Sequence, residues 1–504
     1  MAYDLAAYSI LDAPPNPGAD TMSVEAAYRV AAAGSLQSVR AALEVVGRRQ
    51  STQRTLLLAA ADLLSGQVPR AMRVLEDGLE PATANARPFL IDILAPLYVM
   101  SNQLEELEDL VETVPEDHPI ALGIAALRVV RDARKRHRST VHADIDDLAN
   151  QLGRFHDDLL TGKVAQRLAL AAYYTKRYEL AMCFAEQSVQ AFVRLQAPRL
   201  AVTPYSIIYN VHHAVTGDCL AALRAAEIMT DLAKAAADRS YLNIGLVAQY
   251  EIAAEMGDSG RLHALRLQIR REAVPEQFRE RFACRVADFL PFAWEDNFEA
   301  LRAGMSIARD ALRLTPPMRA LATALMALAD CALGNAADSR RLSRAAISQA
   351  NLDVRENETA YDCRYRLLAR ALAGSSCVLL GATHRGHRAL DGKAFAKDEE
   401  LAVFIAVAQG RDYRELSIRN RGFGRAIQAT RDRVLKCRSR VDLTRAEQAV
   451  LRMLAEGMTA PQIANQTGRS VSTVRNHTRS IIDKFDVSGR VAALSHARKL
   501  GLLE

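Results

Sequence analysis

Residues 443–485, LTRAEQAVLRMLAEGMTAPQIANQTGRSVSTVRNHTRSIIDKF, carry start and stop signals for three short helices in succession. Thr444 followed three residues later by Glu447 is a capping box, in which the hydroxyl and the carboxylate accept hydrogen bonds from free backbone N–H groups at a helix start. Gly457 supplies the left-handed residue that ends a helix. We therefore predict a first helix that lies between Thr444 and Glu456.

The next helices follow from the same rules. Thr459 and Gln462 repeat the capping pattern, a proline between them is tolerated in the first helical turn, and Gly468 ends a short second helix. Ser470 then caps a third helix. A last helix, from about residue 488 to 499, completes a predicted bundle of four.

The third helix has two contrasting faces. The face expected to turn inward carries, at helical spacing, Val471, Val474, Thr478, Ile481 and Phe485. The opposite face carries Thr473, Arg475, Asn476 and Arg479. Guanidinium groups match the acceptors of guanine and an amide matches adenine, so such a row on the second helix of a helix-turn-helix pair is typical of major-groove binding.

These motifs resemble the LuxR-type (GerE-like) helix-turn-helix domain of bacterial transcription factors, over about an eighth of the chain. The similarity rests on LTRAEQAVLRMLAEG, IA, SVSTVRNHTRSIIDKF and SGRVAAL, in that order. It implies that two such domains pair through the last helix and that a set of polar residues contacts DNA. The implied base or phosphate contacts are Arg475, Asn476 and Arg479, the implied phosphate contacts lie near Ser470, Thr473 and Lys484, and Arg490 completes the set.

Positive charge concentrates in the same part of the chain. The whole sequence has 65 Lys and Arg against 59 Asp and Glu, a formal charge of +6. Residues 411–440 have ten basic and three acidic residues (+7), and residues 441–504 have nine and six (+3), which leaves −4 for the first 410 residues. Such a distribution favours phosphate binding through counterion release, although residues 411–440 alone could be a solvated basic helix.

Residues 24–392 have Ala, Leu and Arg at helical spacing, interrupted by short breakers. The turn markers, 32 to 41 residues apart, are Gly34, Gly66, Asn102, His137, Lys176, Gly217, Gly257, Asn297 and Gly334. Ala71, Ala181 and Ala222 follow turns, where two paired helices must approach. The period is typical of a helical-repeat solenoid of the tetratricopeptide type, with an irregular helical bundle as the alternative, and the fold class is all-α.

A solenoid leaves a concave face that suits a protein, a peptide or a small effector. Aromatic and His residues are frequent in the middle repeats, and most such residues form core. The candidate effector-binding residues are Tyr205, Tyr209, His212, Tyr250 and Trp294, chosen from a wider set that also includes Tyr173, Tyr174 and His213. The adjacent His212 and His213 would point about 100° apart on a helix, so we expect no metal site.

The domain boundaries follow the breaks in pattern. Residues 1–23, with PPNPG at 14–18, are predicted to form an irregular arm before the helical domain at 24–392. Residues 393–440 are predicted to be a basic helical connector that allows relative motion, and residues 441–504 the DNA-binding unit.

Several classes of protein are disfavoured. The seven cysteines form no Cys-x-x-Cys motif, which argues against a zinc site and against a disulfide framework. No apolar run approaches the roughly twenty residues of a membrane span. We therefore expect a cytoplasmic protein without membrane contact. Gly162-Lys163 is followed by Val164, so the phosphate loop of nucleotide hydrolases is missing, and no receiver-domain pattern or Gly-x-Ser-x-Gly elbow occurs. We expect neither enzyme activity nor a cofactor.

The sequence favours a bacterial regulator that binds operator DNA as a homodimer and responds to an effector or partner on its helical domain. RNA polymerase is a further expected partner. The alternatives are a helical-repeat scaffold whose C-terminal unit mediates dimerisation without DNA, and a polymerase subunit resembling a sigma factor.

Overall fold

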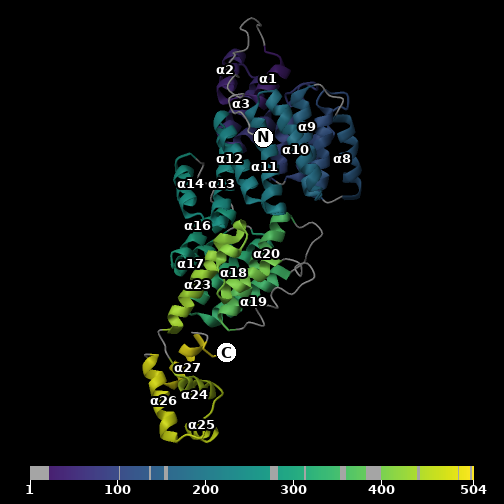
Figure 1. Ribbon diagram of the computed structural model, residues 1–504. Helices are drawn as coiled ribbons and strands as arrows, with labels where there is room; N and C mark the ends of the chain where they lie inside the picture. The colour runs from purple at the N-terminus through teal and green to yellow at the C-terminus, as the bar shows by residue number, and fades with distance from the viewer. Residues whose placement is uncertain are drawn as a thin grey trace. The chain divides into compact units, whose positions relative to one another are not determined.

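The computed structural model of the protein describes residues 22–101, 103–135, 138–152, 157–272, 282–311, 314–351, 359–381, 399–439, 443–485, 487–499 and 502–503. Within these ranges the regular structure is helical and contains no strand, which confirms the all-α prediction (Figure 1). Only the last two residues of the predicted arm at 1–23 are described. The chain divides into two compact units, made of residues 1–250 with 263–278 and of residues 251–262 with 279–504.

The first unit consists of paired helices. They are α1 (Val24–Ala33), α2 (Leu36–Val46), α3 (Thr52–Leu64), α4 (Val68–Leu79), α5 (Arg87–Ser101), α6 (Leu104–Glu112), α7 (Ala121–Lys135), α8 (Arg138–Leu152), α9 (Asp158–Tyr174), α10 (Tyr178–Arg194), α11 (Pro198–Asn210) with the π-helical turn η2 (Val211–Thr216), and α12 (Cys219–Ala235). Two more helices, α13 (Arg239–Met256) and α14 (Ser259–Glu272), have residues in both units.

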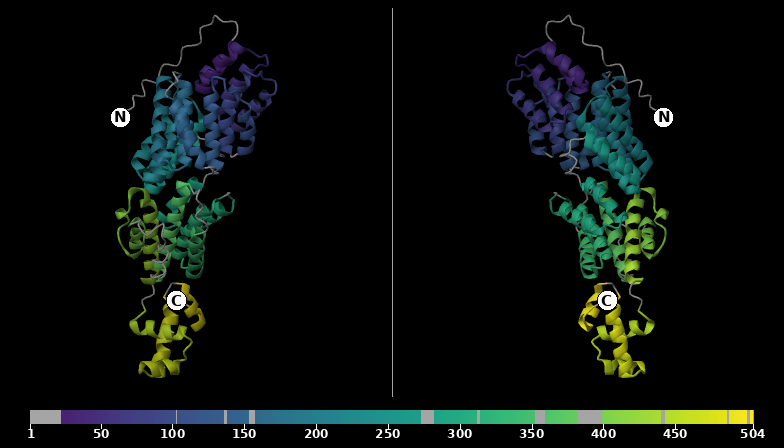
Figure 2. Two further views of the ribbon diagram at one scale, coloured as in Figure 1. Left: turned by 90° about the vertical axis from the view of Figure 1, so that its right-hand side faces the viewer. Right: turned by 90° about the vertical axis from the view of Figure 1, so that its left-hand side faces the viewer.

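The second unit continues with helices. They are α16 (Phe282–Trp294), α17 (Phe298–Ala311), α18 (Pro316–Ala332), α19 (Ala336–Asn351), α20 (Ala360–Leu379), α22 (Glu399–Gln409), the short 3₁₀ turns η3 (Tyr413–Glu415) and η4 (Ile418–Asn420), α23 (Arg421–Ser439), α24 (Arg445–Ala455), α25 (Ala460–Thr467), α26 (Val471–Lys484) and α27 (Arg490–Lys499). Figure 2 shows α24 to α27, in yellow, from two sides.

One type of turn closes many of the helix pairs. A residue with left-handed backbone ends the first helix, and the next N–H donates to the carbonyl five residues back, as in a Schellman motif. Such bonds, 2.8 to 3.0 Å long, are Gln67 to Asp62, Arg177 to Ala172, Ala197 to Phe192, Asp238 to Ala233, Asn297 to Phe292 and Asn335 to Asp330. The left-handed residues are Gly66, Lys176, Gln196, Ala237, Asp296 and Gly334. Several predicted turn markers therefore lie at helix ends, whereas Asn102 and His137 lie outside the described residues.

Small residues let the paired helices approach. Ala71, Ala181 and Ala222 are fully buried, as the sequence predicts. Glycine has the same role between α9 and α10, where a Cβ on Gly162 would come within 2.4 Å of the Phe192 ring. The helical pairing is thus present, while a regular tetratricopeptide-like repeat stays a prediction.

The apolar side chains of the described residues gather in separate large cores. One, in the first unit, extends from Ala27 to Ile207. The second unit has a core between Val286 and Val434 and another between Leu443 and Leu503. Phe404, which lies in the segment predicted to be a connector, is buried in the core that ends at Val434. Four residues of α23 belong to the same core: Phe423, Ala426, Ile427 and Val434. No described helix is long and apolar enough to cross a bilayer.

Candidate nucleic-acid interface

The predicted start signals of the last helices form as expected. Thr444 Oγ1 accepts a hydrogen bond from Glu447 N at 3.3 Å, and Glu447 Oε2 accepts one from Thr444 N at 2.6 Å. At the start of α25 the Thr459 N–H donates to Gln462 Oε1 at 2.8 Å. Ser470 Oγ accepts from Thr473 N at 3.1 Å and so fixes the first turn of α26. The last helix starts at Arg490, two residues later than predicted.

The inward face of α26 holds the helix in place. Val474, Ile481 and Phe485 are buried in the core of the bundle, and Val471 is partly buried against it. Leu451 and Leu454 of α24 belong to the same core. Because these contacts fix the rotation of α26 about its axis, they also determine which side chains face outward.

Glu447 joins α24 to α26. Its carboxylate is buried and accepts hydrogen bonds from Ser480 Oγ at 2.6 Å and from Lys484 Nζ at 2.7 Å, besides the one from the Thr444 N–H. Burial alone would raise the pKa of Glu447, but the hydrogen bonds from Lys484, Ser480 and Thr444 outweigh it and lower the pKa to about 2. The sequence indicated the capping role of Glu447 but not its contacts with α26, which lie 33 and 37 residues away.

Arg475, Asn476 and Arg479 are exposed on the opposite face of α26. Arg475 and Arg479 are one helical turn apart and Asn476 is adjacent, so the three side chains share one side of the helix. Among the described residues none of the three takes part in an ion pair or a side-chain hydrogen bond. Their donors are therefore available to an external partner rich in acceptors.

The turn before α26 is short. Gly468 is left-handed, with φ of 64°, and ends α25. Two residues later Ser470 begins the capping of α26, so the two helices form a helix-turn-helix. Residues 441–497 match the family model described as bacterial regulatory proteins, luxR family. These residues are a LuxR-family helix-turn-helix domain. No curated protein matches the chain.

Arg469 and His477 interact within the LuxR-family domain. Arg469 Nη1 donates to His477 Nε2 at 2.8 Å, so the neutral imidazole would carry its proton on Nδ1. His477 is partly buried next to the inward stripe of α26. The bond connects the turn to the middle of α26.

Two residues of the predicted DNA-binding set have partners inside the LuxR-family domain. The ammonium of Lys484 is paired with Glu447. The Arg490 guanidinium donates to the carbonyl oxygens of Leu454 at 3.2 Å and Met458 at 2.9 Å, and so caps the end of α24. Both therefore have structural contacts, while Ser470 and Thr473 lie at the helix start and Arg475, Asn476 and Arg479 point outward.

The candidate effector residues are divided between the two units. Tyr205, Tyr209 and Tyr250 are buried, and His212 is partly buried, in the first unit. Trp294 belongs to the second unit, where its Nε1 donates to Gly422 O at 2.9 Å and the Arg425 guanidinium lies 4.9 Å from the ring centre. An effector role for this set stays a prediction.

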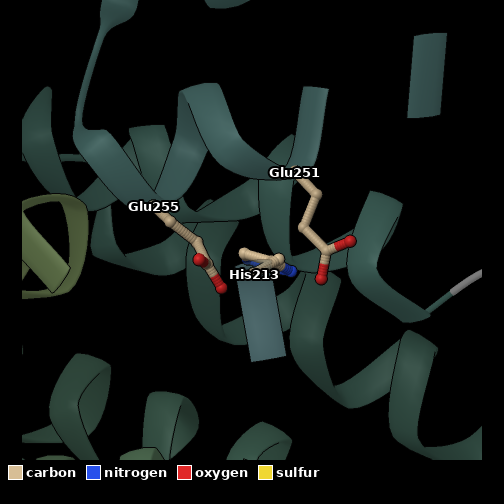
Figure 3. A group of neighbouring side chains, drawn as sticks. All are labelled: His213, Glu251 and Glu255. Atoms are coloured by element: carbon tan, nitrogen blue, oxygen red, sulfur yellow. The ribbon is translucent and has the colours of Figure 1, made fainter. Parts of the chain in front are cut away.

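Glu251 and Glu255 are one turn apart on α13, and Figure 3 shows both, together with His213 of the first unit. Both glutamates have partners in their own unit. Arg364 Nη2 lies 2.5 Å from Glu255 Oε2, and the Tyr365 hydroxyl donates to Glu251 Oε1 at 3.4 Å. Because these groups already satisfy the carboxylates, we assign them no ligand.

Proposed function

We propose that the chain is a transcription regulator that binds operator DNA through α26. The observation that carries the proposal is the exposed row of Arg475, Asn476 and Arg479 on a helix that Glu447 and the bundle core hold at fixed rotation. Two guanidinium groups and an amide on one helical face match the acceptor pattern of a major groove. The family match of residues 441–497 points to the same partner.

We further propose that two chains bind an inverted repeat through paired α27 helices. Val491 on α27 is 82% exposed, and Ser495 and Arg498 are exposed on the same side of that helix. A valine so exposed is a candidate for burial against a second copy. Sedimentation of the protein–operator complex should give two chains per duplex, and V491D should reduce this to one.

The test of DNA binding uses the full-length chain. Capture of sheared genomic DNA yields the operator, and fluorescence anisotropy of a labelled duplex then gives the Kd at several salt concentrations. R475A, N476A and R479A should each weaken binding about ten- to hundredfold, because a bidentate base contact contributes about 1–3 kcal/mol. A residue that contacts phosphate should also lower the salt slope by about 1.

R452A is the matched control, because it removes the same charge as R475A or R479A. Arg452 is exposed on α24, outside the helix-turn-helix pair. The Kd of R452A for the operator should stay within about twofold of the parent's, because salt screens the loss of a single exposed charge. Unchanged affinity of the R475A/N476A/R479A triple variant would refute the role of α26. Failure of the parent chain to retain any DNA would favour the scaffold alternative.

A further inference from the structure

The first unit contains a cavity of about 180 Å³ between α1, α3, α5, α7, α9, α11 and α13. Eleven of its eighteen lining residues are aliphatic, among them Leu63, Leu97, Val130 and Leu170. A dry apolar cavity of about 150 Å³ is large enough to hold benzene. The space therefore suits the body of a small apolar molecule.

One wall of the cavity is charged. Asp92 lies there with Lys163 and Arg167. Arg167 Nη2 is 2.7 Å from Asp92 Oδ1, and Lys163 Nζ pairs with Asp92 Oδ2. The Tyr28 hydroxyl donates to the same Oδ2 at 2.6 Å and accepts from Lys163 Nζ at 3.0 Å. Asp92, Lys163 and Arg167 are 1%, 8% and 5% exposed, so water screens them poorly.

This wall has more positive than negative charge. Among the described residues that line the cavity, Asp92 alone is acidic, and it faces two cations. Arg199, the third cation of the lining, is already balanced by Asp238, with Arg199 Nε 3.0 Å from Asp238 Oδ2. Burial lowers the pKa of Lys163, and Arg167 lowers it further although Asp92 acts against them. With Lys163 protonated, the group of Asp92, Lys163 and Arg167 carries a formal charge of +1, which is costly in a buried site without a counter-ion.

Arg167 also has an unused donor. Its Nη1 is buried and has no hydrogen-bond partner among the described residues. A buried N–H group without an acceptor costs about 1–3 kcal/mol, and more when it is charged. Gly123 makes room for this nitrogen, since a Cβ there would lie 2.7 Å from Nη1. The excess positive charge of the cavity wall favours an anion beside Arg167 and Lys163.

We propose that this cavity binds a small organic monocarboxylate, with the carboxylate at Arg167 and Lys163 and a compact apolar body among the aliphatic side chains. A single carboxylate beside the Arg167 and Lys163 side chains, which both line the cavity, neutralises the formal charge of +1. The mainly aliphatic lining disfavours phosphate or a polyanion, which would bury further charge. As the effector of a regulator, this ligand rests on the proposed function, whereas the binding site itself does not.

Isothermal titration of the full-length chain tests the site with three probes, phenylacetate, cyclohexanecarboxylate and 4-methylpentanoate. Phenylacetamide, which has the shape of phenylacetate without its charge, and inorganic phosphate are the controls. At least one carboxylate should bind saturably, and phenylacetamide should bind roughly tenfold or more weakly than phenylacetate if the acid binds. Absence of saturable binding by all three carboxylates, or equal affinity for acid and amide, would overturn the proposal.

Two variants test the residues. R167M leaves the balanced pair of Asp92 and Lys163, and should weaken carboxylate binding about ten- to hundredfold. L170F keeps every charge but narrows the cavity, and should weaken binding as well; circular dichroism checks that each variant is folded. If folded R167M and L170F both bind as the parent does, the ligand lies elsewhere and the proposal is wrong.

The titration contains no DNA. Whether the carboxylate binds is therefore decided independently of whether the chain binds operator DNA. The Kd for the operator is then measured with and without saturating carboxylate. A change of at least about threefold, absent in R167M, would support an effector role. An unchanged Kd with intact carboxylate binding would reject the effector role.

Discussion

Replacement of Glu447 by Gln should loosen α26 without changing any residue that faces outward. The carboxylate accepts three hydrogen bonds, from Thr444 N, Ser480 Oγ and Lys484 Nζ. An amide of the same shape loses the ion pair and presents N–H donors where only acceptors fit. The first and third helices of the LuxR-family domain would then be held mainly by their apolar contacts.

The magnitude follows from the pKa. The ordinary value of 4.5 falls to about 2 in the folded chain, and one pKa unit corresponds to about 1.4 kcal/mol, so the ionised form contributes about 3 kcal/mol. The Lys484 side chain is 34% exposed and is partly screened by solvent, which reduces the expected loss to about 2 kcal/mol. Because the folded pKa is lowered, this stabilisation is fully present above pH 4.5 and is lost as the pH falls towards 2.

Hydrogen–deuterium exchange of the full-length chain measures the effect locally. At neutral pH the slowest amides of α24 and α26 in E447Q should exchange about 30-fold faster than in the parent, which corresponds to about 2 kcal/mol. E456Q removes an exposed carboxylate from the end of α24 and should leave exchange unchanged. Equal protection in E447Q and the parent at neutral pH would show that Glu447 does not brace α26.

Three further changes have outcomes fixed by single contacts. R490Q shortens the side chain that caps α24, so amides at the end of α24 should lose about 1 kcal/mol of exchange protection; no change would mean that the cap is redundant. R364M leaves the buried Glu255 carboxylate without its cation, and calorimetry should show a destabilisation of about 3–5 kcal/mol, which an unaltered unfolding temperature would disprove. G162A forces a methyl group against Phe192 and should cost about 1–3 kcal/mol by the same method; a stability equal to the parent's would show that the Phe192 ring moves freely.

The LuxR-family domain was predictable because its signals are local. Thr444, Glu447, Gly468 and Ser470 act on backbone groups within a few residues, so their spacing alone predicts the helix starts and the turn. The inward and outward faces of α26 follow from the helical period. The structure has the expected helices and exposes Arg475, Asn476 and Arg479.

Contacts between distant residues could not be predicted in the same way. Lys163 meets Asp92 across 71 positions and Tyr28 across 135, and no periodicity in the sequence connects them. In the sequence, Gly162-Lys163 stands out only as an incomplete phosphate loop, whereas in the fold the glycine admits Phe192 and the lysine joins the buried charges. The prediction of an effector site at Tyr205, Tyr209 and Tyr250 rests on aromatic character, which does not distinguish a pocket from a core; the three side chains are buried.

The Schellman-type turn that closes α3 onto α4, α9 onto α10 and α18 onto α19 depends on hydrogen bonds within a six-residue segment. A helical hairpin defined so locally can be duplicated or deleted as a piece, and only its two flanking contacts need to be rebuilt. Evolution of this part of the chain would then proceed in steps of about 34 to 40 residues, and homologues should differ in length by whole hairpins.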